Sequence, residues 1–308
     1  MPIKSTLSSV IENVHQSSAN HHDLIACVQD MEFDSLEKMW ITGEQVAVLP
    51  SAQRLFSNRL RIPYAYLSRC PSLLQAENLN HWLEIEQKQR DTFYCRFDGK
   101  QLRAVFTERF IPIDNLECLS KMIEYGFDSE TEVHFSLDPE MMVVNVPDND
   151  RVFQLPGKDR IVPGISIANS EVGVLALTIQ AYALRLICSN GMIAKTAVNA
   201  RYKHISRRVM DEFPLVLENV IHQSSHVQDR FQISVQTLVD NPESTIDTFA
   251  RQFQIPQMQT EIVKRAFYLE QGATMFHIIQ AFTRAAQDIN LSATDSYRME
   301  KAGGTILS

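Results

Sequence analysis

The segment from residue 195 to residue 208 has the residue types and spacing that most plainly suggest a chemistry, the binding of an anion. It carries five Lys or Arg side chains and no Asp or Glu. At helical spacing, the basic side chains fall on two adjacent helix faces. A solvated face normally mixes acids with bases, so the acid-free run predicts contact with a polyanion. The predicted binding residues here are Lys195, Arg201, Tyr202, Lys203, His204, Arg207 and Arg208.

Three cations earlier in the chain, Arg96, Lys100 and Arg103, extend this predicted surface, and Tyr94 lies beside them. Cations that follow phosphates and rings that accept stacked bases are typical of grooves for single-stranded nucleic acid. The sequence therefore predicts single-stranded DNA as the partner. The alternative is that these cations neutralise acidic blocks of the same chain.

The net charge of −8 hides an alternation of acidic and basic blocks. Residues 113–150 carry 1 Lys or Arg and 10 Asp or Glu, whereas residues 151–210 carry 9 and 2. Local potential rather than net charge governs the attraction of a polyanion, so an acidic total does not exclude nucleic acid. Blocks of opposite sign also offer complementary faces, and we expect a homo-oligomer.

Catalytic chemistry has weaker support in the sequence. Cys188 could act as a nucleophile with His204 as its base, but no spacing places the two side by side, so Cys188 is expected to be a packing residue. The five cysteines form no C-x-x-C pair, and no zinc, P-loop or dinucleotide motif occurs, so no cofactor and no metal are expected. The sequence favours a binding protein over an enzyme, with a hydrolase of unassigned catalytic residues as the second alternative.

Two turn-rich motifs lie near the middle of the chain. Asn190–Gly191 predicts a tight turn, because Gly adopts positive φ readily and Asn tolerates it. Glu171 and Arg185 lie in or beside apolar stretches where an unpaired charge is costly, so they would pair if their strands face each other. The motif residues are Asn169, Ser170, Glu171 and Gly173, then Arg185, Cys188, Asn190 and Gly191.

Period-2 and helical patterns predict an α+β fold. Residues 93–106 predict a β-hairpin around Asp98–Gly99, and residues 133–146 predict a second around Asp138–Pro139. A capping-box pattern from residue 114 to residue 117 starts a helix between them. The pattern is helical from residue 197 to the end. We expect an N-terminal segment with a short helix and strands (residues 1–50), an α+β core with a mixed or antiparallel sheet (51–210) and a helical C-terminal region (211–308).

The two motifs, with the segment from His277 to Ala286 and that from Ile62 to Leu67, resemble a phage- and plasmid-like protein family of unknown function found on mobile elements. The resemblance covers roughly residues 45–305. The outline of hairpins backed by a helix also resembles, more weakly, the Rad-fifty-two-like strand-annealing proteins. These resemblances imply a single-strand annealing or recombination accessory that works as an oligomer. The alternative is a protein–protein interaction or regulatory protein related to host defence.

The start of the chain has no apolar stretch of signal-peptide length, and no run approaches 18 apolar residues. An odd number of scattered cysteines is typical of a reducing compartment. The sequence therefore predicts a cytoplasmic protein with no membrane partner.

Overall fold

The computed structural model describes residues 3–155, 159–185, 190–194, 200–202, 208–223, 227–270 and 272–307. The helices are α1 (Leu7–Ser17), α2 (Pro50–Arg59), α3 (Tyr64–Leu67), α4 (Ser72–Gln87), α5 (Asn115–Tyr125), α6 (Arg208–Gln223), α7 (Val227–Gln236), α8 (Pro242–Gln252), α9 (Gln257–Glu270), α10 (Met275–Ala285) and α11 (Ala293–Leu307). The strands are β1 (Ile3–Thr6), β2 (His21–Cys27), β3 (Met31–Phe33), β4 (Lys38–Ile41), β5 (Glu44–Val48), β6 (Thr92–Asp98), β7 (Gln101–Phe106), β8 (Glu132–Leu137), β9 (Met142–Pro147), β10 (Phe153–Gln154), β11 (Arg160–Asn169), β12 (Leu177–Arg185), β13 (Asn190–Ala194) and β14 (Ala200–Tyr202).

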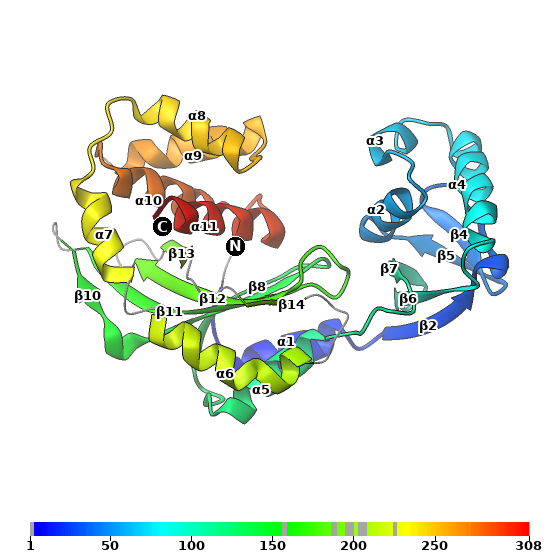
Figure 1. Cartoon of the computed structure of the whole chain (residues 1–308), viewed down its shortest axis with the longest axis horizontal. Coiled ribbons are helices and arrows are strands. Elements are labelled where there is room, and N and C mark those ends of the chain that lie inside the picture. The colour runs from blue at the N-terminus through cyan, green and yellow to red at the C-terminus, as the bar shows by residue number, and fades with distance from the viewer. Residues whose placement is uncertain are drawn as a thin grey trace.

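The strands form two sheets, each in its own lobe (Figure 1). The large lobe holds an antiparallel sheet in the order β1-β8-β9-β11-β12-β13, with β10 on β11 and β14 on β12. Helices α1, α5 and α6 cover one face of this sheet, and α7 to α11 lie over the other (Figure 1). Because both faces are covered, the sheet strands are buried on both sides, as β12 shows along almost its whole length.

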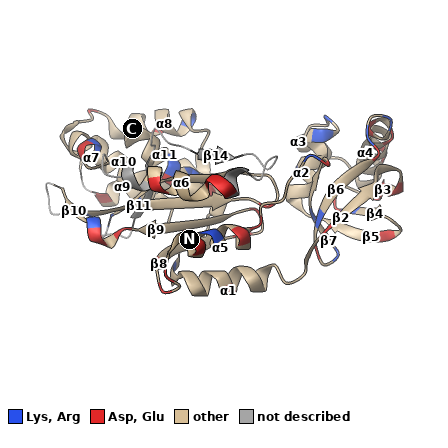
Figure 2. Ribbon diagram, turned by 60° about the horizontal axis from the view of Figure 1, so that its bottom comes forward, with Lys and Arg blue, Asp and Glu red and all other residues tan. Residues whose placement is uncertain are grey.

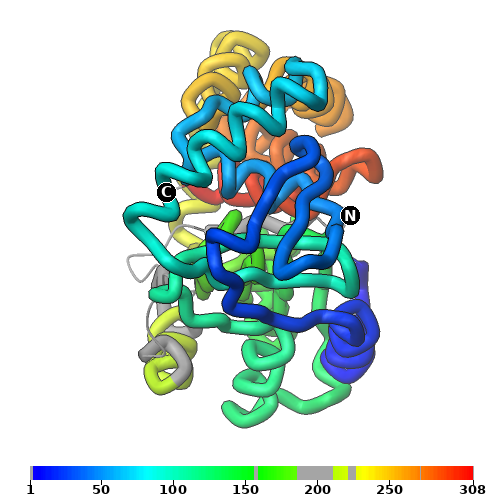
Figure 3. Tube along the Cα trace, turned by 90° about the vertical axis from the view of Figure 1, so that its right-hand side faces the viewer, coloured from blue at the N-terminus to red at the C-terminus, as the bar shows by residue number. Residues whose placement is uncertain are grey.

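The small lobe comprises residues 21–106 and forms a mixed sheet in the order β2-β6-β7-β5-β4-β3. Its strands β5 and β7 are parallel, and the other pairs are antiparallel. Helices α2 and α4 complete its own apolar core, which includes Phe33, Phe56 and Phe93. Seen from its own side, the small lobe lies in front of the large one (Figure 3). The lobe is thus an insertion between α1 and α5 of the large lobe.

A layer of buried polar side chains lies between α11 and the large sheet. Gln180 on β12 donates to the Tyr297 hydroxyl at 2.7 Å. Glu300 on the same helix is only 2 % exposed, although it is a carboxylic acid. Burial raises the pKa of Glu300 to about 7, against a hydrogen bond from Asn145 on β9 that lowers it.

The predicted α+β class is confirmed, with both hairpins, the helix between them and helices from residue 211 onward. The first hairpin turns at Gly99–Lys100, one residue later than predicted, because Asp98 still pairs with Gln101. The small-lobe sheet runs across residue 50, so the boundary predicted there does not separate two units. The boundary predicted at residue 210 falls inside α6, whose residues share a core with the large sheet.

Candidate functional site at the junction of the lobes

The motif of residues 169–173 begins at the last residue of β11 and contacts the start of α5 and the end of β7. Asn169 Nδ2 donates to the Ile113 carbonyl at 2.9 Å and to Asn115 Oδ1 at 3.0 Å. Gly173 has φ of +79°, and a Cβ there would lie 2.8 Å from the ring of Phe106. Glycine is required here for both its backbone conformation and its close approach to the ring.

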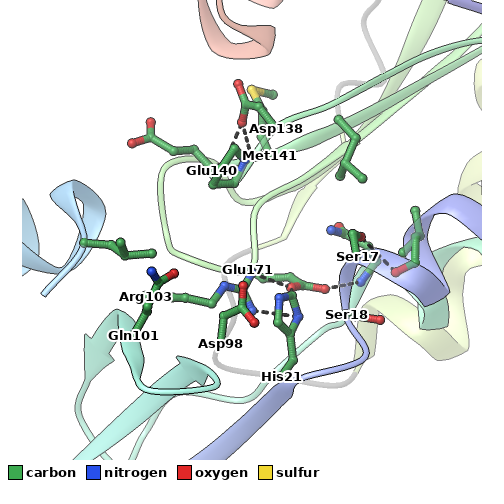
Figure 4. Close-up of a pocket in the computed structure, with 15 residues that line it drawn as sticks. Ser17, Ser18, His21, Asp98, Gln101, Arg103, Asp138, Glu140, Met141 and Glu171 are labelled. Atoms are coloured by element: carbon green, nitrogen blue, oxygen red, sulfur yellow. Dashed lines mark hydrogen bonds and ion pairs between the residues drawn. The ribbon is translucent and has the colours of Figure 1, made fainter. Parts of the chain in front are cut away.

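Glu171 is the central residue where the two lobes meet, which we call the junction, and it is only 5 % exposed. Its Oε2 accepts a hydrogen bond from Arg103 Nη2 at 2.8 Å. Its Oε1 accepts one, also at 2.8 Å, from the backbone N–H of Asn115, the first residue of α5. A carboxylate at this position also interacts favourably with the helix dipole. Arg103 donates in turn to His21 Nδ1 at 2.8 Å, so one carboxylate links α5, β7 and β2 (Figure 4).

Arg96 makes a second set of bonds across the same junction. Its Nε donates to Asp23 at 2.9 Å, its Nη2 donates to Asp114 and its Nη1 donates to the Glu171 carbonyl at 3.3 Å. Asp114 is the N-cap residue of α5, but its side chain makes no capping bond. The helix therefore starts where the capping-box pattern predicted. The carboxylate that accepts from its first N–H is Glu171 and not Asp114.

The protonation states of the junction follow from burial and these contacts. Burial would raise the pKa of Glu171, but the Asn115 N–H and Arg103 outweigh it, so the pKa is lowered. Burial lowers the pKa of His21, and the charge of Arg103 lowers it further. His21 is therefore a neutral ring at pH 7, and because it accepts at Nδ1, we infer that its proton is on Nε2.

A cavity of about 450 Å³ opens beside this network (Figure 4). Four carboxylates and one cation, Arg103, line it. Three of the carboxylates are bonded: Glu171 as above, Asp138 to backbone amides including Ala293 N, and Glu140 to Arg54. Only Asp98 has no bonding partner among the described residues. An acidic lining disfavours the binding of a phosphate. Because most of these polar side chains are already hydrogen-bonded within the protein, we interpret the junction as a structural contact between the two lobes.

The predicted roles of Arg96 and Arg103 in nucleic-acid binding are wrong. Their exposed fractions are 3 % and 6 %, and carboxylates bind both guanidinium groups. Tyr94 also donates to Asp23. The alternation of residues along these strands was predicted correctly. The face of β6 and β7 that carries the two arginines, however, packs against the large lobe. Lys100 alone of the three is exposed, at the hairpin turn.

The basic segment of residues 195–208 is only partly described. Arg201 and Tyr202 lie on β14, which pairs with β12, so the helix predicted from residue 197 is wrong at this point. Arg208 is the first residue of α6. Lys195, Lys203, His204 and Arg207 lie outside the described residues.

The second motif stabilises the far end of the large sheet. Arg185 donates to Asp159 at 2.9 Å and to Glu270 on α9, so it does not pair with Glu171 as predicted. Asn190 and Gly191 lie on β13 and pair with Arg185 and Leu184, so the prediction that they form the turn is wrong. Cys188 lies outside the described residues.

No group of three or more His, Cys, Asp or Glu residues suited to a metal ion occurs in the described ranges. The described cysteines are free, and burial raises the pKa of Cys95 to about 12, which makes it a poor nucleophile. Sequence reasoning missed His21, Asp23 and Asp114 as partners of the arginines. Their partners are 18 to 82 residues away, and no local pattern marks them.

A family model described as a domain of unknown function (DUF932) matches residues 104–306. This range contains both motifs and almost all of the large lobe after β1 and α1. No curated protein and no solved structure matches the chain. In the part of the chain that is described, no helix has the length and apolar character to cross a bilayer.

Proposed function

We propose that this chain, which belongs to the DUF932 family of unknown function, binds nucleic acid and prefers single strands. The supporting observation is the pairing state of its cations. The buried arginines are bound by carboxylates, whereas a group of exposed cations in and just after the small lobe has no carboxylate partner among the described residues. This group is Arg61, Arg69, Lys88, Lys100 and Arg109.

Unpaired exposed cations are the usual means of attracting a phosphate backbone. Figure 2 shows Lys and Arg on the segments around α2 and α3 of the small lobe. The acid-free segment of residues 195–208, which runs from the end of β13 to the first residue of α6, supplies five more Lys or Arg. In its finer form, the proposal is a cytoplasmic strand-annealing or recombination accessory of a mobile element.

We expect fluorescence anisotropy to show salt-sensitive binding of labelled single-stranded DNA. Each phosphate contact contributes about −0.7 to the slope of log affinity against log salt, so three to five contacts give roughly −2 to −3.5. Changing Arg201, Lys203, Arg207 and Arg208 to Gln should weaken binding to unrelated sequences and flatten this slope.

The control for this experiment is the double change Arg160→Gln and Arg265→Gln, which removes exposed cations elsewhere in the large lobe. It should leave affinity within about twofold. If the quadruple change instead lowers the melting temperature and the wild-type protein shows no salt-sensitive binding, the basic segment neutralises acidic blocks and the proposal fails.

We also expect self-association, because the acidic and basic blocks offer complementary faces. Light scattering at micromolar concentration should give a mass above the 35.2 kDa of one chain. A strict monomer with and without DNA would exclude the oligomeric annealing form of the proposal, while leaving nucleic-acid binding open to the titration above.

A second candidate, a protein-interaction role, is favoured by apolar side chains exposed on α3 and α4. Tyr66, Leu73 and Leu74 are 47 %, 72 % and 39 % exposed. Exposed aromatic and aliphatic groups of this kind are common at protein interfaces. The same DNA titration distinguishes the two candidates. A protein-binding surface predicts that the wild-type protein shows no salt-sensitive binding of DNA.

A further inference from the structure

A pocket of about 280 Å³ in the small lobe brings an exposed tryptophan together with three arginines. It lies where the end of α2 meets the second half of α4, outside the range matched by the family model. We call it the Trp82 pocket. Its lining residues are Arg59, Leu60, Arg61, Trp82, Ile85, Glu86, Gln89 and Arg90.

The charges of the Trp82 pocket are unbalanced in favour of cations. Glu86 is its one lining carboxylate, and it is shared by Arg59 at 3.5 Å and Arg90 at 3.3 Å. Arg61 is exposed and has no carboxylate partner in the described part of the chain. It follows the C-cap residue of α2 with φ of +58°, a conformation in which Gly is usual. A helix C-terminus accounts for a nearby cation but not for an exposed aromatic ring beside it.

Trp82 is the aromatic element of the pocket and is 43 % exposed. Leu79 and Leu83 on the same helix are buried in the core of the small lobe. At helical spacing the indole lies at the edge of this buried face, and 43 % of it remains open to solvent. Indole rings accept stacked bases, so a partly exposed indole in a pocket that three arginines also line suits a ligand that is both planar and anionic.

We propose that the Trp82 pocket binds one unpaired nucleotide of a single strand. The base stacks on the Trp82 indole, and Arg61 and Arg90 contact the adjoining phosphates. The bases of a duplex are already stacked and cannot offer a free face, so this site selects single strands. The inference rests on the proposed nucleic-acid binding and identifies the site that gives it strand preference.

Glu86 sets the strength of this site, because it competes with phosphate for Arg90 and also neutralises Arg59. Glu86→Gln should therefore raise affinity for single-stranded DNA, about threefold to tenfold at low salt, and steepen the salt slope. A gain in affinity is informative because a misfolded variant does not produce one. Arg61→Gln should have the opposite effect and flatten the slope by about 0.7.

The chain has two tryptophans, which makes stacking directly observable. In the variant Trp40→Phe, Trp82 is the only indole left. Titration with an oligothymidylate of about 16 nucleotides should quench its fluorescence and saturate at the affinity that anisotropy gives. The matching duplex should quench it little at equal concentration.

Trp82→Ala should weaken single-strand binding roughly 5- to 150-fold, and Trp82→Phe should recover part of the loss. Trp40→Ala is the matched control, because Trp40 is 41 % exposed but lies among acidic residues of another pocket. It should leave affinity unchanged.

The possible outcomes distinguish failure of the Trp82 pocket from failure of the proposed nucleic-acid binding as a whole. Salt-sensitive binding without quenching, and with full affinity in Trp82→Ala, overturns the Trp82 pocket and leaves nucleic-acid binding standing. Equal quenching by duplex overturns the single-strand assignment. Absence of wild-type binding at low salt overturns both. If Trp82→Ala fails to fold, quenching in Trp40→Phe and the gain in Glu86→Gln still decide the question.

Discussion

Glu171→Gln is expected to lower the free energy of unfolding by roughly 3–5 kcal/mol, the loss typical of breaking a buried ion pair from one side. The change keeps the shape of the side chain but removes the charge that Arg103 and the start of α5 share. Arg103, at 6 % exposed, would remain buried without a counter-ion. Urea unfolding, followed by circular dichroism, measures the effect.

The control for this prediction is Glu124→Gln, which removes an exposed carboxylate paired with Lys121 on α5. Its effect should stay below about 1 kcal/mol, as for other surface pairs. Because the pKa of Glu171 is lowered on folding, its stabilisation is present above its ordinary pKa and lost as the pH falls through the folded value. A Glu171→Gln loss equal to that of the control would contradict a central role for this carboxylate.

Glu300→Gln is expected to stabilise the protein at pH 8, by on the order of 3 kcal/mol. Burial raises the pKa of Glu300 from 4.5 to about 7, so at pH 8 the folded protein holds a buried charge. The raised value means that this group's contribution is fully favourable below about pH 4.5 and is lost as the pH rises through about 7. Thermal melts of wild type and variant across pH 4 to 9 measure the difference.

The melting temperatures of wild type and variant should agree below about pH 4.5, separate between about pH 4.5 and 7, and differ by a constant amount at higher pH. Glu84→Gln, an exposed carboxyl on α4, is the control and should shift neither end. A variant that is less stable than wild type at every pH would mean that the ionised carboxylate makes favourable contacts under α11.

Local patterns in the sequence predicted most of the elements and few of the contacts between them. The period-2 pattern of residues 93–106 and the helix start at residue 114 depend only on neighbouring residues, and the structure has both. The pairing of β5 with β7 joins residues more than 50 positions apart, and no local pattern carries that information. The prediction of a domain boundary at residue 50 failed for this reason.

The candidate site shows the same limit. Arg96 and Arg103 were predicted to extend the nucleic-acid surface because they are cations on the hairpin that carries Tyr94, and such a role needs a hairpin face that is open to solvent. That face meets the motif of residues 169–173 instead. Trp82 and Arg61 were missed because they are 21 positions apart, one on α4 and the other just after α2, and only the fold brings them together.

The insertion of the small lobe also fixes an order of events during protein synthesis. Residues 21–106 hold their whole sheet and can fold as soon as they leave the ribosome. The first strand, β1, must wait for β8, more than 120 residues later, before it can pair. The buried polar layer stays open until α11, the final helix described, arrives to cover it. For most of its translation the large sheet is therefore an incomplete, apolar surface, and it depends on its last segment for protection from aggregation.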